Sequence, residues 1–228
     1  MSPDPASDDP KKRLFGHFAL IGKALSCDHR LALLELLAQG SRDVDTLARL
    51  AQLSAANASQ HLKHLGRAGL VTARRDGKHV IYRLTDNAVI ELLAALRRIA
   101  ESNLAEVGMV VANHFRDGDG LEPVSREELL RRMRAGAVTV VDVRAPEEYA
   151  AGHLPGAVNV TLATLEQRLD ALPRGAEIVA YCRGPYCAPT FEAVAAFRRA
   201  GFKARRLEDG FPEWRAAGLP VQAEPAGA

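Results

Sequence analysis

The sequence is poor in sulfur and in aromatic side chains. Its 228 residues include three cysteines, three methionines and one tryptophan, and aromatic residues make up 5%. So few cysteines, and an odd number of them, exclude the disulfide framework of small secreted domains. No apolar run reaches the roughly 18 residues that a membrane span needs. No apolar segment follows the first residues, MSPDPASDDPKKR, so a secretory signal is not expected. These absences predict a cytoplasmic protein with no membrane partner.

Charge is present in near balance overall but is concentrated locally. The net charge is +2, yet the segment from Ser54 to Leu84 holds six basic residues against one acidic residue, Asp76. The basic residues are Lys63, Arg67, Arg74, Arg75, Lys78 and Arg83. A basic patch of this kind is typical of a surface that binds nucleic acid.

The first half of the chain has helical periodicity and then a hairpin. The segment DHRLALLELLAQG predicts a helix with Asp28 as its N-cap, and SRDVDTLARLAQL predicts a shorter one. A third helix begins after Ser54, and two alternating segments around Asp76-Gly77 predict a β-hairpin. Together these elements predict a winged helix-turn-helix. A long amphipathic helix from Asp86 onward predicts a dimer interface.

The second half alternates strands with helices. The runs AVTVVDV, EIVAYC and KARRLE predict strands of a parallel sheet, and helical segments lie between them. We therefore expect two domains, a mostly-α winged helix-turn-helix followed by an α/β domain with a parallel sheet. The expected boundaries are a disordered tail at 1–12, the winged domain at 13–113, a linker at 114–122, the α/β domain at 123–222 and a tail at 223–228.

The segment YCRGPYC carries the chemistry of the second domain. Cys182 follows a predicted strand and precedes a helix, where backbone N–H groups and the helix N-terminus favour a thiolate. Arg183 supplies a cation for an oxyanion donor such as thiosulfate. Gly184 and Pro185 shape the turn, and Tyr186 completes the loop. Cys187 has two interpretations: a resolving cysteine that closes a disulfide with Cys182, or a small residue at a helix start.

Residues 123 to 222 resemble a single-domain rhodanese. The resemblance is carried, in order, by VVDVRAPEEYAAGHLPGAVNV, YCRGPYC and LEDGFPEWRAAGLPV. It implies a sulfurtransferase in which Cys182 takes a sulfane sulfur as a persulfide and passes it to an acceptor. It also implies that Asp142 and Arg144 support the loop and that Trp214 packs the core. Related phosphatases need an arginine six positions after the cysteine, and Ala188 stands there, so phosphatase activity is not expected.

Residues 13 to 113 resemble the ArsR/SmtB family of winged-helix repressors. The resemblance is carried by HRLALLELL, DVDTLARLAQLSAANASQHLKHLGRAGLV and RRDGKHVIYRL. It implies a homodimer that binds double-stranded operator DNA through a recognition helix from Ser54 to Arg67. The side chains expected to contact the major groove are Asn57, Ser59, Gln60, Lys63 and His64. Those on the wing near phosphates are Arg74, Arg75 and Lys78.

The metal sensing of this family does not carry over to the sequence. Its ligand motif would fall at LARLAQLS, which contains neither cysteine nor histidine. His61 and His64 lie three residues apart on a helix that we expect to contact DNA. We therefore expect no metal and no cofactor. Cys27 is interpreted as a buried small residue, with a redox or sulfur-accepting role as the alternative.

Three functions remain open at this stage. The first is a transcriptional repressor whose rhodanese domain forms a persulfide on Cys182 and senses or transfers sulfane sulfur. The second is mainly a sulfurtransferase that uses thiosulfate or a persulfide and carries a regulatory DNA-binding domain. The third is a metal-responsive or metalloid-responsive repressor in which the rhodanese domain only docks a partner.

Overall fold

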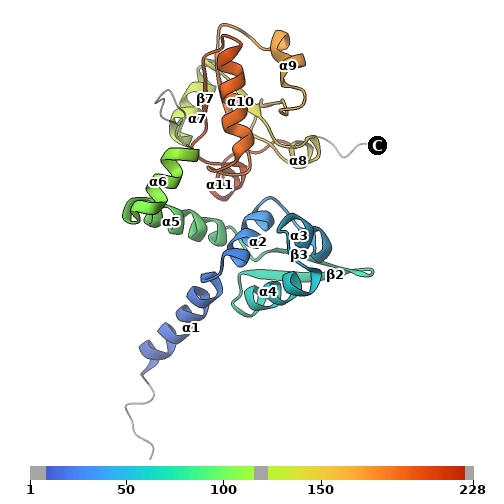
Figure 1. Ribbon diagram of the computed structural model, residues 1–228, viewed down its shortest axis with the longest axis vertical. Coiled ribbons are helices and arrows are strands. Elements are labelled where there is room, and N and C mark those ends of the chain that lie inside the picture. Colours follow the sequence, from blue (N-terminus) through green and yellow to red (C-terminus); the bar gives the residue numbers. More distant parts are fainter. Residues whose placement is uncertain (1–8, 116–122, 224–228) are drawn as a thin grey trace, which may run out of the picture. The chain divides into compact units, whose positions relative to one another are not determined.

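The computed structural model describes residues 9–115 and 123–223 (Figure 1). The chain divides into two compact units, Met1–Ile90 and Glu91–Ala228. Helix α5 (Ala88–Asn103) crosses the boundary between them. The described residues include no helix that is both long and apolar enough to span a membrane.

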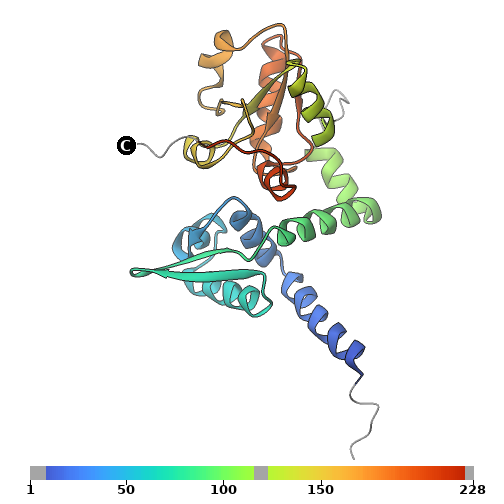
Figure 2. The same cartoon turned by 180° about the vertical axis from the view of Figure 1, so that it is seen from behind.

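The first unit is a helical fold with a three-stranded antiparallel sheet in the order β1-β3-β2. Figure 2 shows the β2–β3 hairpin extending away from the helices of its unit. The elements before α5 are α1 (Pro10–Leu25), α2 (Asp28–Ala38), β1 (Arg42–Asp43), α3 (Val44–Leu50), α4 (Ala55–Arg67), β2 (Val71–Asp76) and β3 (His79–Leu84). This arrangement is the predicted winged helix-turn-helix.

Side-chain caps and one glycine set the boundaries of the helix-turn-helix and its wing. The Ser54 hydroxyl accepts the N–H of Asn57 at 3.2 Å and so begins α4. The Asp43 carboxylate accepts the N–H of Thr46 at 2.8 Å and begins α3 in the same way. Gly77 has a φ of 58°, which the tight turn between β2 and β3 requires.

Three sequence predictions for this half of the chain are wrong in detail. Helix α1 begins at Pro10, so residues 10–12 are helical rather than part of the tail, while residues 1–8 lie outside the described residues. The N-cap of α2 is Cys27, and Asp28 is the first helical residue. The long helix after Asp86 is two helices, α5 and α6 (Ala105–His114), because Leu104 has extended backbone between them.

The second unit contains a four-stranded parallel sheet in the order β5-β4-β6-β7. After α6, its helices are α7 (Arg126–Arg134), α8 (Pro146–Ala151), α9 (Leu165–Arg168), a short 3₁₀ turn (Leu169–Ala171), α10 (Ala188–Arg199) and α11 (Phe211–Ala216). Its strands are β4 (Val138–Asp142), β5 (Val158–Asn159), β6 (Glu177–Tyr181) and β7 (Ala204–Arg206). The sequence predicted β4, β6 and β7, whereas β5 has two residues and gave no pattern.

Apolar side chains of the central strands alternate between two cores, one on each face of the sheet. Val141, Ile178 and Ala180 belong to the core that includes residues of α9 and α10. Val140 and Val179 belong to the other core, which includes residues of α7 and α11. Strands buried on both faces are almost wholly apolar, which explains why the runs AVTVVDV and EIVAYC predict strands of a parallel sheet.

Candidate active site and nucleic-acid interface

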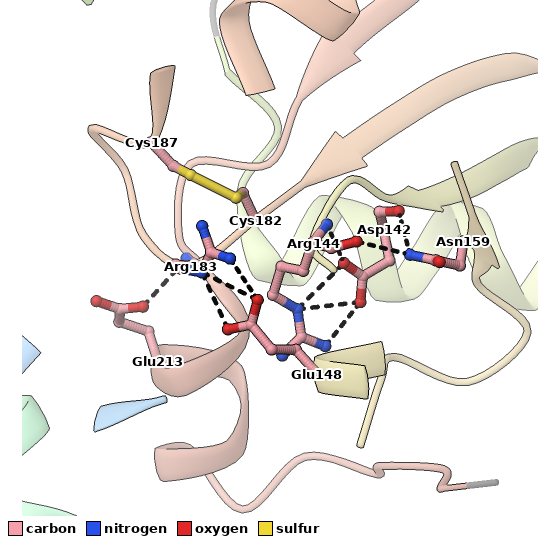
Figure 3. The surroundings of a disulfide bond; sticks show 9 residues. Asp142, Arg144, Glu148, Asn159, Cys182, Arg183, Cys187 and Glu213 are labelled. Carbon is pink, nitrogen blue, oxygen red and sulfur yellow. Dashed lines mark hydrogen bonds and ion pairs between the residues drawn. A yellow bond between two sulfur atoms is a disulfide. The ribbon is translucent and has the colours of Figure 1, made fainter. Parts of the chain in front are cut away.

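The cysteine loop, residues 182–187, joins the end of β6 to the start of α10 (Figure 3). Cys182 is buried, and Cys187 is half-buried and is the N-cap of α10. The two cysteines form a disulfide with their Cα atoms 6.2 Å apart. Inside the loop, the N–H of Cys187 donates to the carbonyl of Gly184 at 3.2 Å. The loop is therefore short enough to bring both sulfur atoms together.

Gly210 supports the loop by direct contact between backbones. A Cβ on Gly210 would lie 2.5 Å from both Arg183 C and Gly184 Cα, which is closer than side-chain atoms approach backbone. The N–H of Phe211 donates to the Cys182 carbonyl at 2.9 Å, and the Glu213 carboxylate accepts the N–H of Gly210 at 3.1 Å. The N-terminus of α11 thus fixes the base of the loop.

A buried ion pair lies at the end of the neighbouring strand. Arg144 donates through Nη2 to Asp142 Oδ2 at 2.7 Å, and both side chains are at most 1% exposed. Arg144 also donates to the Gly152 carbonyl at 2.6 Å, and its guanidinium lies 4.1 Å from the centre of the Phe211 ring. The ion pair therefore reaches the loop through Phe211, whose ring contacts Arg144 and whose N–H donates to the Cys182 carbonyl.

Arg183 is paired with an acidic side chain that the sequence prediction did not include. Its Nε donates to both carboxylate oxygens of Glu148 on α8, at 2.9 and 3.1 Å. Burial raises the pKa of Glu148, but the hydrogen bond and charge of Arg183 outweigh it, so the pKa is lowered overall. The same hydrogen bond raises the pKa of Arg183. The predicted cation for an oxyanion donor is therefore already compensated by a carboxylate.

The other loop residues contact neighbouring elements. Gly184 is buried, and Pro185 and Tyr186 are half-buried. The Tyr186 hydroxyl donates to Glu101 of α5. Burial and this hydrogen bond raise the pKa of Tyr186, so its hydroxyl keeps its proton near neutral pH.

The predicted DNA-contacting residues lie on the outer surface of the first unit. On α4, Ala58, Leu62 and Leu65 are buried, and the opposite face is open to solvent. Four of the five predicted α4 residues are exposed and Ser59 is half-buried; all three wing residues are exposed. A hollow along α4 is lined by Ala56, Ser59, Gln60, Lys63, His64 and Arg67. One helix thus presents a continuous polar and basic face.

Cys27 and the histidines do not assemble into a metal site among the described residues. Cys27 is half-buried and not fully buried as expected, and its Sγ lies 3.7 Å from Asp28 Oδ1. The His29 and His61 rings lie 5.6 Å apart. Within residues 9–115 and 123–223, no group of three or more histidine, cysteine or acidic side chains could hold a metal ion. The absence of a cofactor stays a prediction.

Two family models match the two halves of the chain. Residues 27–73 match the model described as bacterial regulatory protein, arsR family, and residues 125–217 match the rhodanese-like domain. The HTH-type transcriptional regulator Rv0324 of Mycobacterium tuberculosis is 45% identical over 213 residues, which is 93% of each chain. The chain belongs to the arsR family of bacterial regulatory proteins. This arsR-family chain is a DNA-binding transcriptional regulator that carries a C-terminal rhodanese-like domain.

Further relatives match one half each. A sulfurtransferase of Allochromatium vinosum is 31% identical over 87 residues, covering 38% of this arsR-family chain and 79% of the relative. The solution structure of the homodimeric winged helix-turn-helix DNA-binding domain of Mb0332 from Mycobacterium bovis is 36% identical, with a TM-score of 0.41. That match covers 46% of this chain and 95% of the domain.

Sequence reasoning located the cysteine loop of this arsR-family regulator but missed the residues that hold it. The structure brings Asp142, Arg144, Cys182, Arg183 and Cys187 to one end of the parallel sheet (Figure 3). Glu148 and Gly210 were missed, although both lie inside quoted motifs, because an acidic residue or a glycine in a motif does not reveal its partner. The N–H groups predicted to point at the Cys182 sulfur stay a prediction.

Gly210→Ala is expected to destabilise the rhodanese-like domain by about 1–3 kcal/mol, because the added methyl group overpacks the loop backbone. Trp214 is the chain's one tryptophan and is buried in this domain, so its fluorescence in urea measures the unfolding. Gly175→Ala is the matched control, since a Cβ there meets no atom within 4 Å. Equal stability of the two variants would contradict the proposed close approach.

Glu148→Gln is expected to lower the unfolding free energy at pH 7 by about 1 kcal/mol, because the ion pair is partly open to solvent. The folded-state pKa of Glu148 is lowered, so its stabilisation is present at neutral pH and is lost as the pH falls through that pKa. Urea unfolding followed by Trp214 fluorescence at pH 7 and pH 3 measures this. A difference between parent and variant that persists undiminished at pH 3 would contradict the assignment.

Proposed function

We propose that this regulator is a repressor whose rhodanese domain receives sulfane sulfur on Cys182 and converts that event into a change of DNA affinity. The observation that carries the proposal is the cysteine loop itself, in which Cys182 and Cys187 reach disulfide distance at the end of β6. The same chain presents an exposed polar and basic helix face on α4. A sulfur-reactive loop and a DNA-binding face in one chain make coupling of the two the simplest function.

The chemistry proceeds in two balanced steps. The Cys182 thiolate attacks the outer sulfur of a persulfide donor, R–S–SH, and forms Cys182–S–SH as the donor leaves as a thiol. The Cys187 thiolate then attacks the Cys182 sulfur, forms the disulfide and releases the sulfane sulfur as hydrogen sulfide. Two thiols are oxidised, and the donor sulfur is reduced to sulfide and thiol. A thiol reductant reopens the loop.

The charge around the loop favours a sulfur donor that has no oxyanion group for Arg183 to bind. Thiosulfate is a dianion and is best held by an uncompensated cation. Arg183 is paired with Glu148, so the loop presents no net positive charge from that pair. A persulfide or polysulfide is therefore the proposed donor class. The 31% identity to a protein named sulfurtransferase supports sulfur transfer as the underlying reaction.

Exposed apolar side chains support a homodimer. Phe18 on α1 is 59% exposed and Ile99 on α5 is 62% exposed, and further apolar residues on these helices are also open to solvent. Solvent-facing apolar surface of this extent is typical of a protein interface. The predicted homodimer would bury it and present two copies of α4 to the two halves of an operator. The cytoplasmic location stays a prediction.

Cys182→Ser is expected to abolish the response to sulfur. A DNA duplex selected from a random library by the parent protein serves as the probe in gel-shift titrations, with and without inorganic polysulfide. Polysulfide should change the parent's affinity and leave that of the serine variant unchanged, because the acceptor sulfur is gone. Cys187→Ser should accumulate the persulfide, seen by mass spectrometry as one added sulfur on Cys182. A serine variant at 182 that responds like the parent would refute sulfur sensing.

Lys63→Ala and Arg75→Ala are expected to weaken binding to the same probe in different ways. In the proposed complex Lys63 faces the major groove, so Lys63→Ala should weaken binding by about 1–3 kcal/mol and relax sequence specificity. Arg75 lies on the wing, and its loss should weaken all sequences alike and reduce the salt slope by about one. Lys203→Ala, an exposed lysine of the rhodanese domain, is the control. Parent-like binding by both variants would show that α4 and the wing do not dock as proposed.

A further inference from the structure

The second unit includes most of α5 and all of α6, and both helices contact the cysteine loop or its support. The Tyr186 hydroxyl, one residue from Cys187, donates to Glu101 on α5. The Phe115 ring, at the end of α6, lies 5.1 Å from the Tyr186 ring and 5.9 Å from that of Phe191 on α10. One side of the loop is therefore held by residues outside the rhodanese motifs.

A second contact reaches the other side of the loop. Arg97 on α5 forms an ion pair with Glu213 on α11. Glu213 in turn accepts the N–H of Gly210, whose backbone contacts Arg183 and Gly184. The α5 helix thus reaches the Cys187 end of the loop through Glu101 and the Cys182 end through Arg97.

Burial indicates that the Arg97 contact is more than a surface pair. The Arg97 side chain is 23% exposed and that of Glu213 is 10% exposed, so solvent screens the pair little. The acceptor of the Tyr186 hydroxyl is a carboxylate, and hydrogen bonds to charged groups are stronger than neutral ones. Both contacts are present with the loop closed by the disulfide.

We propose that Arg97 and Glu101 are positioning residues for the cysteine loop and that α5 is the element through which the state of the loop biases DNA binding. This inference rests on the proposed function. Helix α5 begins inside the first unit, where Val89 and Ile90 are buried, and its later turns contact the loop. Because Glu101 and Arg97 contact the closed loop and its support, closing the loop also favours one position of α5 against them. By linkage, DNA binding and loop closure then change each other's equilibrium by the same factor.

The first experiment measures the loop without DNA. The full chain is equilibrated with reduced and oxidised glutathione, and the closed fraction is read by alkylation and mass spectrometry. Tyr186→Phe and Glu101→Gln should each shift the equilibrium constant toward the open dithiol by about tenfold, because a hydrogen bond to a carboxylate made in the closed loop is lost. Glu106→Gln, an exposed residue of α6, is the matched control and should match the parent. A parent-like equilibrium in both test variants would overturn the positioning role.

The second experiment measures coupling to DNA with the selected duplex. In the parent, treatment of the reduced chain with polysulfide changes the DNA affinity by a measurable factor. In Tyr186→Phe and Arg97→Gln that factor should fall toward one, while alkylation and mass spectrometry still show that polysulfide consumes the free thiol of Cys182. Variants whose Cys182 thiol is consumed and that keep the full factor would overturn the coupling through α5. A parent whose Cys182 thiol is consumed with no change in affinity would instead refute the proposed function, and the glutathione equilibrium would still test the positioning role.

Discussion

The buried ion pair between Asp142 and Arg144 is the interaction on which the geometry of the cysteine loop depends. Two charges withdrawn from water are tolerable only when each is fully hydrogen-bonded, and here the guanidinium is shared between a carboxylate, a backbone carbonyl and an aromatic ring. Those partners come from β4, the segment after α8 and the start of α11. One side chain thereby fixes three chain segments that meet beneath the cysteine loop.

The two folds follow from local sequence patterns, and the parts that sequence did not reveal are tertiary. Serine and aspartate caps, a Gly-containing hairpin turn and apolar strands each depend on a few neighbouring residues. The helix start at Ser54, the turn at Gly77 and strand β4 can therefore be predicted from the sequence. Glu148 is paired with a residue 35 positions away, and nothing local in PEEY specifies that partner. The same holds for Tyr186 and Glu101, which are 85 positions apart.

Two predictions that the structure contradicts, the start of α2 and the unbroken helix after Asp86, have physical reasons. Asp28 is a good N-cap residue, yet the helix begins one residue earlier than a cap at Asp28 would give: Cys27 is the N-cap, and the Asp28 carboxylate accepts the N–H of His29 from within the first turn. The break at Leu104 lies within an unbroken amphipathic pattern. The Asn103 side chain there donates to the carbonyl of Ile99, and asparagine side chains that bond nearby backbone are unfavourable in a helix interior and common at helix ends.

The position of α5 gives the chain two different domain boundaries. By fold, the rhodanese-like region begins near Pro123, whereas by packing the unit begins at Glu91. A fragment excised at the fold boundary would keep every rhodanese motif yet lose Arg97, Glu101 and Phe115, which contact the cysteine loop or its support. The two halves of this regulator are consequently not interchangeable modules: exchanging the rhodanese region for that of another protein would require its surface to be refitted to α5.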